Sequence, residues 1–170
     1  DLVIGDNGRI DWTAAGELAQ VQSSDAQLGA DDQIATGDGM NIAVGGFGAD
    51  TVTSGDGADI VLGDDGLIDF VVDDGDAGDI DRIVSTSTAA YGGTDTISTQ
   101  GGSDIVIGGR AGDTIDSGEG DNLVIGDSGQ IISDTVNAPQ LGDLPITIGL
   151  IQSTQLDDGG TDLIAAGAGD

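Results

Sequence analysis

A nine-residue spacing of glycine, aspartate and aliphatic residues constrains this chain more than any other feature. Each row opens with small turn residues and ends with an aspartate or asparagine followed by a triplet whose centre is aliphatic. The rows are residues 36–44, 45–53, 54–62, 99–107, 108–116 and 117–125. A fixed internal period is typical of repeat architectures, in which each unit buries its apolar side chains by stacking on its neighbours.

A longer period contains these rows. A shift of 63 positions superimposes residues 32–70 on residues 95–133 without a gap, and both ends of the chain hold partial copies. The sequence therefore predicts one continuous solenoid in which repeat blocks alternate with insertions. The predicted blocks are 1–10, 32–68, 95–131 and 161–170, and the predicted insertions are 11–31, 69–94 and 132–160.

The row consensus G-G-x-G-x-D-x-U-x, with U a large aliphatic residue, resembles the RTX (repeats-in-toxin) calcium-binding nonapeptide family. The resemblance implies an all-β fold, a parallel β-roll or β-solenoid with two rows, 18 residues, in each coil. Glycine permits positive φ in the turns, and side chains alternate along a strand, so the triplet centre points inward. The expected inward residues are Ile34, Ala43, Val52, Val61, Ile97, Val106, Ile115 and Val124.

Turns on one edge of such a roll come from alternate rows, which stacks their aspartates at one strand spacing. Stacked carboxylates repel one another unless a cation lies between them, and Ca²⁺ accepts carboxylate and carbonyl oxygens together. In the RTX family calcium lies between successive turns on the same edge. The resemblance assigns side-chain ligands to Asp32, Asn41, Asp50, Asp59, Asp95, Asp104, Asp113, Asn122 and Asp162. It assigns carbonyl ligands near Gly37, Gly39, Gly46, Gly48, Gly55 and Gly57.

Several positions depart from the family pattern. Asn41 and Asn122 are neutral, which weakens or empties their sites, and Thr94, Gln100 and Ala111 replace expected turn residues. Aspartate and glycine also dominate ordinary turns, so a metal-free solenoid of Asx turns is an alternative. Calcium remains the favoured interpretation because the aspartates keep the nine-residue register.

Alternate rows differ in what flanks the inward residue. One set has aliphatic flanks, such as Ile60 and Leu62, whereas the other has polar flanks, such as Thr51 and Thr53. One sheet is therefore apolar on both faces and needs a cover. The blocks close with GDNG, GDDG and GDSG, after which Ile10, Ile68 and Ile131 stand in the aspartate position. We expect strands at 17–24, 79–88 and 146–154 in the insertions to cover that sheet, together with Trp12 and Phe70, rather than loose loops.

Charge and composition exclude several classes of protein. The net charge of −29 excludes nucleic acid and anionic membrane as direct partners. No apolar run approaches the length of a membrane span, so no membrane insertion is expected. Acidity and 32 glycines would also suit a disordered chain, but the hydrophobic content of 37% argues against disorder unless a cation is missing. The acidic run Asp73–Asp81 lacks EF-hand spacing, so a solvated loop is favoured over another cation site.

Catalysis is not expected. Ser128 lies in a GDSG segment, but a serine nucleophile needs a neighbouring base, and the chain has no histidine or lysine. Two-carboxylate glycosidase chemistry would need a cleft that aromatics usually line, and aromatics are 2% of the chain. Ice binding through Thr51 and Thr53 is disfavoured because a regular threonine array is absent.

The leading functional hypothesis is a calcium-binding structural module of a large secreted or cell-surface bacterial protein, such as an adhesin or a filament. The alternative is the calcium-dependent folding and secretion module of an RTX toxin or hydrolase whose catalytic domain lies elsewhere. The resemblance implies export from a Gram-negative bacterium by type I secretion. Because residues 167–170 and 1–8 read together match residues 118–129 in register, we expect head-to-tail stacking on copies of itself or on flanking repeats.

Overall fold

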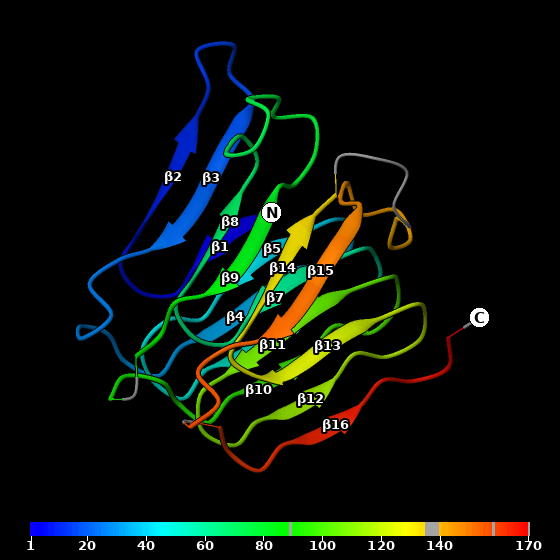
Figure 1. Ribbon diagram of the computed structural model, residues 1–170. Coiled ribbons are helices and arrows are strands. Elements are labelled where there is room, and N and C mark those ends of the chain that lie inside the picture. Colours follow the sequence, from blue (N-terminus) through cyan, green and yellow to red (C-terminus); the bar gives the residue numbers. More distant parts are fainter. Residues whose placement is uncertain (89, 135–139, 158, 170) are drawn as a thin grey trace.

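A computed structural model describes residues 1–88, 90–134, 140–157 and 159–169, and in these residues the fold is all-β, without helices. The strands form three sheets, two parallel and one antiparallel (Figure 1). Parts of the predicted insertions 69–94 and 132–160, and the last residue of the predicted block 161–170, lie outside the described residues. No helix in the described part of the chain has the length and hydropathy that a membrane span requires.

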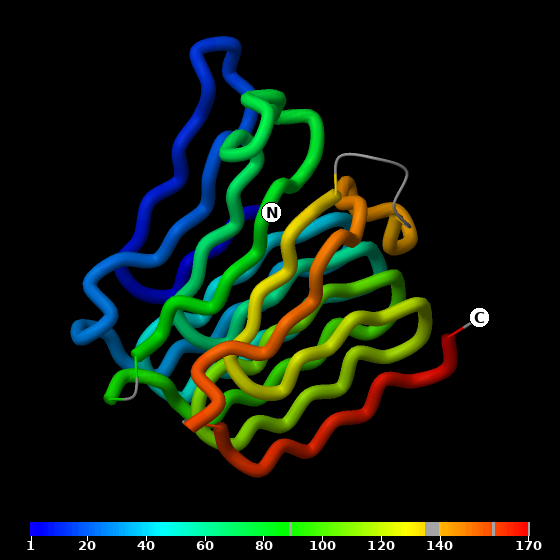
Figure 2. The backbone as a smooth tube through the Cα atoms, viewed as in Figure 1, coloured from blue at the N-terminus to red at the C-terminus, as the bar shows by residue number. Residues whose placement is uncertain are grey.

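Two five-stranded parallel sheets contain the repeat rows. The middle sheet has the order β1 (Leu2–Ile4), β5 (Ile42–Val44), β7 (Ile60–Leu62), β11 (Ile105–Gly109) and β13 (Leu123–Asp127). The Thr sheet has the order β16 (Leu163–Ala165), β12 (Thr114–Asp116), β10 (Thr96–Ser98), β6 (Thr51–Ser54) and β4 (Gln33–Gly37). Successive rows lie in alternate sheets, so the chain passes from one sheet to the other at the end of each row. The backbone tube in Figure 2 shows this path.

The register of the parallel strands follows the repeat. Ile42 pairs with Ile60 and Thr96 with Thr114, which places neighbouring strands 18 residues apart, the length of two rows. Pairing continues in the same phase across the second insertion, where Ile60 lies beside Ile105. The 18-residue spacing of these paired strands is the spacing that two rows in each coil predict.

The middle sheet packs on both of its faces, as its aliphatic flanks predicted. Toward the Thr sheet it buries small and branched triplet centres, which form one thin layer. This layer contains Ile34, Ala43, Val52, Val61, Ile97, Val106 and Ile115, with Val3 and Val124 partly buried beside them. The outward face of the Thr sheet exposes Thr51, Thr53, Thr96 and Thr114 to water.

The covering sheet packs on the other face of the middle sheet. It is a six-stranded antiparallel sheet of three hairpins, each formed by the end of a predicted block and the insertion that follows it. Its order is β15 (Ile148–Ser153), β14 (Gly129–Ser133), β9 (Arg82–Ser85), β8 (Gly66–Asp69), β3 (Leu18–Ser23) and β2 (Gly8–Trp12). The strands β3, β9 and β15 fall within the three predicted insertion strands. Ile68 and Ile131 lie in β8 and β14, buried in the layer between the two sheets rather than in a turn.

Two sequence-based expectations are wrong in detail. Phe70 is buried in that layer, but Trp12 is 57% exposed, because it ends the edge strand β2 whereas Phe70 follows the central strand β8. In the acidic run, Asp73, Asp74 and Asp76 are exposed as expected. Asp81 is buried instead, and its Oδ2 accepts a hydrogen bond of 2.9 Å from the Asp73 N–H.

Candidate cation sites

The predicted side-chain ligands form two ladders, one along each edge of the paired parallel sheets. The first ladder runs through Asp32, Asp50, Asp95, Asp113 and Asp162. The second runs through Asn41, Asp59, Asp104 and Asn122. All nine residues therefore lie where the alternation of rows placed them.

One hydrogen bond repeats along both ladders. In the first, the N–H of Asp32 donates to Asp50 Oδ1 at 2.8 Å, and the N–H of Asp50 donates to Asp95 Oδ1 at 2.8 Å. In the second, the N–H of Asn41 donates to Asp59 Oδ1 at 2.9 Å, and that of Asp59 donates to Asp104 Oδ1 at 2.8 Å. Each of these carboxylates thus uses one oxygen to join two coils, which leaves Oδ2 for another partner.

Most of the second oxygens have no hydrogen bond although they are buried. They are Oδ2 of Asp32, Asp50, Asp59, Asp95 and Asp113. A buried polar atom without a partner costs about 1–3 kcal/mol, and more when it is charged. Neighbouring carboxylates at about 4.8 Å would add a repulsion on the order of 3 kcal/mol at an effective dielectric constant of about 20. A cation or a proton beside these oxygens would reduce both costs.

Burial also raises the proton affinity of these carboxylates. It raises the pKa of Asp50 to about 6, of Asp95 to about 8 and of Asp113 to about 7. Backbone N–H donors oppose the rise, and neighbouring carboxylates increase it. These side chains are between 0% and 1% exposed, so water cannot stabilise their charges.

Glycine carbonyls lie beside the free oxygens of the first ladder. A methyl group on Gly45 would strike both the Gly63 carbonyl oxygen and Asp50 Oδ2. A methyl group on Gly108 would likewise strike the Gly126 carbonyl oxygen and Asp113 Oδ2. The same arrangement recurs at Gly5 and Gly63, and Gly126 lies against Asp162 Oδ2. We call this ladder, with Gly5, Gly45, Gly63, Gly108 and Gly126, the glycine edge.

The second ladder has serine or threonine where the glycine edge has glycine. Thr36, Ser54, Thr99 and Ser117 open its rows, and we call this ladder with these residues the hydroxyl edge. Thr99 Oγ1 donates to Asp104 Oδ2 at 2.6 Å. Asn41 and Asn122 are oriented with Oδ1 toward the ladder and with Nδ2 toward carbonyl oxygens of the turns.

The turns of both edges depend on positive φ angles. Gly37, Gly39, Gly46, Gly48 and Gly57 all have φ between 78° and 145°, whereas Gly55 does not have positive φ. Gln100 and Ala111 replace glycines in this role and adopt φ of 62° and 72°. The second block therefore keeps the turn geometry despite its departures from the consensus.

Three further aspartates, to which the sequence analysis assigned no role, bind backbone N–H groups at the ends of the insertions. Asp64 is buried, and its Oδ1 accepts the Gly93 N–H at 2.9 Å while Oδ2 accepts the Arg110 N–H at 2.5 Å. Burial raises the pKa of Asp64 to about 7. Asp6 accepts N–H groups of Ala30 and Phe47, and Asp127 accepts that of Gly160. The signal that would have identified them is the aspartate shared by GDNG, GDDG and GDSG.

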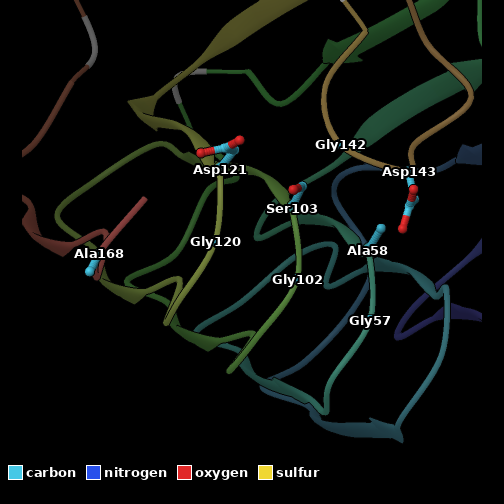
Figure 3. A pocket seen from close by; sticks show the side chains of 9 residues that line it. All are labelled: Gly57, Ala58, Gly102, Ser103, Gly120, Asp121, Gly142, Asp143 and Ala168. Atoms are coloured by element: carbon cyan, nitrogen blue, oxygen red, sulfur yellow. The ribbon is translucent and has the colours of Figure 1, made fainter. Parts of the chain in front are cut away.

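An open groove of about 430 Å³ lies between the hydroxyl-edge turns and the third insertion (Figure 3). Its lining is Gly57, Ala58, Gly102, Ser103, Gly120, Asp121, Gly142, Asp143 and Ala168. It lacks the large apolar and aromatic side chains that usually line small-molecule pockets.

Nowhere among the described residues do three or more acidic side chains gather in a way that could hold a metal ion. A cation on either edge would therefore take many of its ligands from backbone carbonyls. Comparisons with protein-family models, with curated proteins and with solved structures find no match to this chain.

Proposed function

We propose that this chain is a calcium-binding structural module of a large secreted or cell-surface bacterial protein, such as an adhesin or a filament. In this proposal the middle and Thr sheets form one β-roll, a solenoid of two nonapeptide rows per coil. Calcium supplies the charge that the stacked aspartates lack, so that the roll folds and becomes rigid outside the cell.

The observation that carries the proposal is the row of buried, unpartnered Oδ2 atoms on the glycine edge. Asp50, Asp95 and Asp113 each donate and accept along the ladder through N–H and Oδ1, yet their second oxygens have no hydrogen bond. A proton or a cation can satisfy such an oxygen. In neutral extracellular water a divalent cation is the partner that also offsets the net charge of −29.

The donor set fits calcium. Ca²⁺ takes 6–8 oxygen ligands in a flexible geometry and accepts backbone carbonyls beside carboxylates. On the glycine edge, carboxylate Oδ2 atoms and glycine carbonyl oxygens crowd the space that a glycine Cβ would fill. Calcium bound there would neutralise the carboxylates and hold successive coils together.

The covering sheet favours a structural module over a secretion signal. A plain secretion module needs only consecutive nonapeptides, whereas here three hairpins build a second layer over the middle sheet. Such a layer stiffens a roll that is otherwise one thin core. Secretion from a Gram-negative bacterium remains part of the proposal, because low cytosolic calcium would keep the chain unfolded until export.

Circular dichroism and calorimetry test the proposal. With EDTA we expect loss of the strand signal, and calcium near about 1 mM should restore it, as for extracellular calcium modules. Magnesium at the same concentration is the control, since it demands a stricter octahedral geometry. Asp50→Ala should raise the calcium concentration at which half of the chains are folded, whereas Asp76→Ala in the exposed loop should leave it unchanged. A strand signal that chelation leaves unchanged would refute the proposal.

A further inference from the structure

The two edges differ in the groups that can stabilise their buried carboxylates. On the glycine edge every ladder residue is aspartate, and a glycine lies against the Oδ2 atom of each one. On the hydroxyl edge two of the four ladder residues are asparagine, and serine or threonine takes the first position of each row. The edges therefore differ in charge and in available donors.

Asparagine on the hydroxyl edge donates to carbonyls that a cation would otherwise need. Asn41 Nδ2 donates to the carbonyl oxygens of Gly37 and Gly39 at 3.0 and 2.7 Å. It also donates to Asp59 Oδ1 at 2.9 Å. The two N–H donors of this amide are thus shared among three oxygens around one point, which are oxygens that a bound cation would otherwise contact.

Asn122 repeats the arrangement at the other end of the ladder. Its Nδ2 donates to the Ser117 carbonyl at 2.9 Å and to the carbonyls of Gly118 and Ala166 at 3.3 Å. Its Oδ1 accepts the Asp104 N–H at 2.9 Å, which fixes the direction of the amide.

A hydroxyl-bearing residue stands five positions before each of the two carboxylates between the asparagines. Thr99 Oγ1 satisfies Asp104 Oδ2 at 2.6 Å. Ser54 precedes Asp59 by the same five residues, and Ser54 Oγ and Asp59 Oδ2 are both buried without a hydrogen bond. Burial raises the pKa of Asp59, and the Ser54 hydroxyl lowers it. A rotation of the Ser54 side chain would give Asp59 the hydroxyl partner that Asp104 has in Thr99.

We propose that calcium binds along the glycine edge only, and that on the hydroxyl edge asparagine amides and serine or threonine hydroxyls take the place of the cation. This inference rests on the proposed function and narrows it to one edge of the roll. It removes Asn41, Asp59, Asp104 and Asn122 from the set of calcium ligands that the family pattern implies. One edge then holds its coils together without metal while the other responds to extracellular calcium.

A matched pair of variants tests the assignment. Asp50→Asn and Asp59→Asn each remove one charge and keep the oxygen that accepts the ladder N–H. The hydroxyl edge already carries asparagine twice, so the second variant should fold. We expect the Asp50→Asn variant to bind fewer calcium ions in a calorimetric titration. The calcium concentration at which half of its chains are folded should rise about tenfold, because calcium affinity follows the number of charged ligands. Asp59→Asn should keep the ion count and the midpoint of the unchanged chain.

The reverse substitution adds a gain-of-function arm. Asn41→Asp removes the donors to Gly37 and Gly39 and places a carboxylate against their carbonyls. It should bind one more calcium ion than the unchanged chain. The unchanged chain gives a measurement that needs no variant. When a paramagnetic lanthanide replaces calcium, NMR signals of Asp50, Asp95 and Asp113 should broaden, and those of Asn41 and Asn122 should persist.

The outcomes separate the two proposals. A chain that takes up no calcium overturns the proposed function together with this inference. A different result is a chain that binds calcium but loses the same number of bound ions in Asp50→Asn and Asp59→Asn, or that shows equal broadening of NMR signals on both edges. Either result overturns the edge assignment and leaves the proposed function standing.

Discussion

Gln100 and Ala111 of the second block have positive φ, a backbone strain that glycine avoids at the same positions of the first block. Ala111 has φ of 72° at the row position where Gly48 and Gly57 have φ of 122° and 145°. A residue with a Cβ pays about 1–3 kcal/mol for such a conformation. A parallel bridge between Ala111 and Gly159 of the neighbouring turn holds this backbone in place.

Glycine at position 111 should therefore stabilise the chain. We expect Ala111→Gly to raise the free energy of unfolding by about 1 kcal/mol, because relief of the positive φ exceeds the added entropy of the unfolded chain. Urea unfolding in saturating calcium measures the change. Ala49→Gly is the control, since Ala49 is exposed and does not have positive φ, and it should lose about 0.5 kcal/mol. A loss of stability in both variants would contradict the role given to the Ala111 backbone.

At the scale of elements, the covering sheet depends on a few fully buried side chains. Ile83 of β9 and Ile151 of β15 are both cross-strand neighbours of Ile131 in β14. Ile83 is 0% exposed, whereas Ile151 is 46% exposed because β15 is the edge strand. The same substitution at the two positions thus compares the centre of the sheet with its edge.

Ile83→Ala should cost about 2–5 kcal/mol of unfolding free energy, since it removes buried methylene and methyl groups and leaves a cavity. Ile151→Ala should cost clearly less, because water already reaches that side chain. Urea unfolding monitored by circular dichroism in saturating calcium measures both values. Equal costs would mean that the central hairpin does not pack on the middle sheet as described.

The pairing of the parallel strands could be predicted because the repeat itself encodes it. Ile42 beside Ile60 and Thr96 beside Thr114 follow directly from two nine-residue rows per coil. The order of strands in the covering sheet does not follow from the hairpin sequences, so the exposure of Trp12 could not be predicted. The role of Asp64 depends on Gly93, near the far end of the second insertion, and on Arg110, beyond that insertion, so both partners are distant in sequence. The orientation of the Asn41 amide depends on a side-chain rotamer that the row pattern does not specify.

For the whole molecule, pH and calcium should act on the same carboxylates with opposite signs. Folding raises the pKa of Asp50, Asp95 and Asp113 from 3.8 to about 6, 8 and 7. The folded state therefore binds protons more tightly than the unfolded state. Without divalent cations, the stability that protonation provides is complete below pH 3.8 and is lost as the pH rises to about 8.

In EDTA we expect a larger free energy of unfolding at about pH 5 than at about pH 8, by a few kcal/mol, since one pKa unit corresponds to about 1.4 kcal/mol. Calcium binds the deprotonated carboxylates, so its affinity should rise over the same interval. Because the chain is expected to be unfolded in EDTA near neutral pH, circular dichroism in EDTA from about pH 8 to about pH 5 follows the regain of strand signal, and calcium titration at both pH values measures the affinity. A cation-free chain that becomes more stable toward pH 8 would contradict the raised pKa values.

At one end of the three sheets, the edge strands leave core side chains exposed to water. Ile164 in β16 is 43% exposed, although Ile115 and Ile97, which occupy the same place in neighbouring strands, are 1% exposed. Ile151 is exposed beside buried Ile131 in the same way. Both core layers are therefore open to water along β15 and β16, where unpaired strand edges can recruit further strands.

The opposite side of the stack carries the complementary edges β1, β4 and β2. The triplet of β1, Leu-Val-Ile, is identical to the start of β13, so a second copy could add β1 beside β13 in the register used throughout the middle sheet. We expect calcium-loaded chains to associate end to end with increasing concentration in sedimentation velocity. Ile164→Lys should abolish the association, because it buries a charge in the joined core, whereas Leu156→Lys in an 83% exposed position should not. Calcium-loaded chains that stay monomeric at all concentrations, or that associate equally with Ile164→Lys, would exclude stacking through these edges.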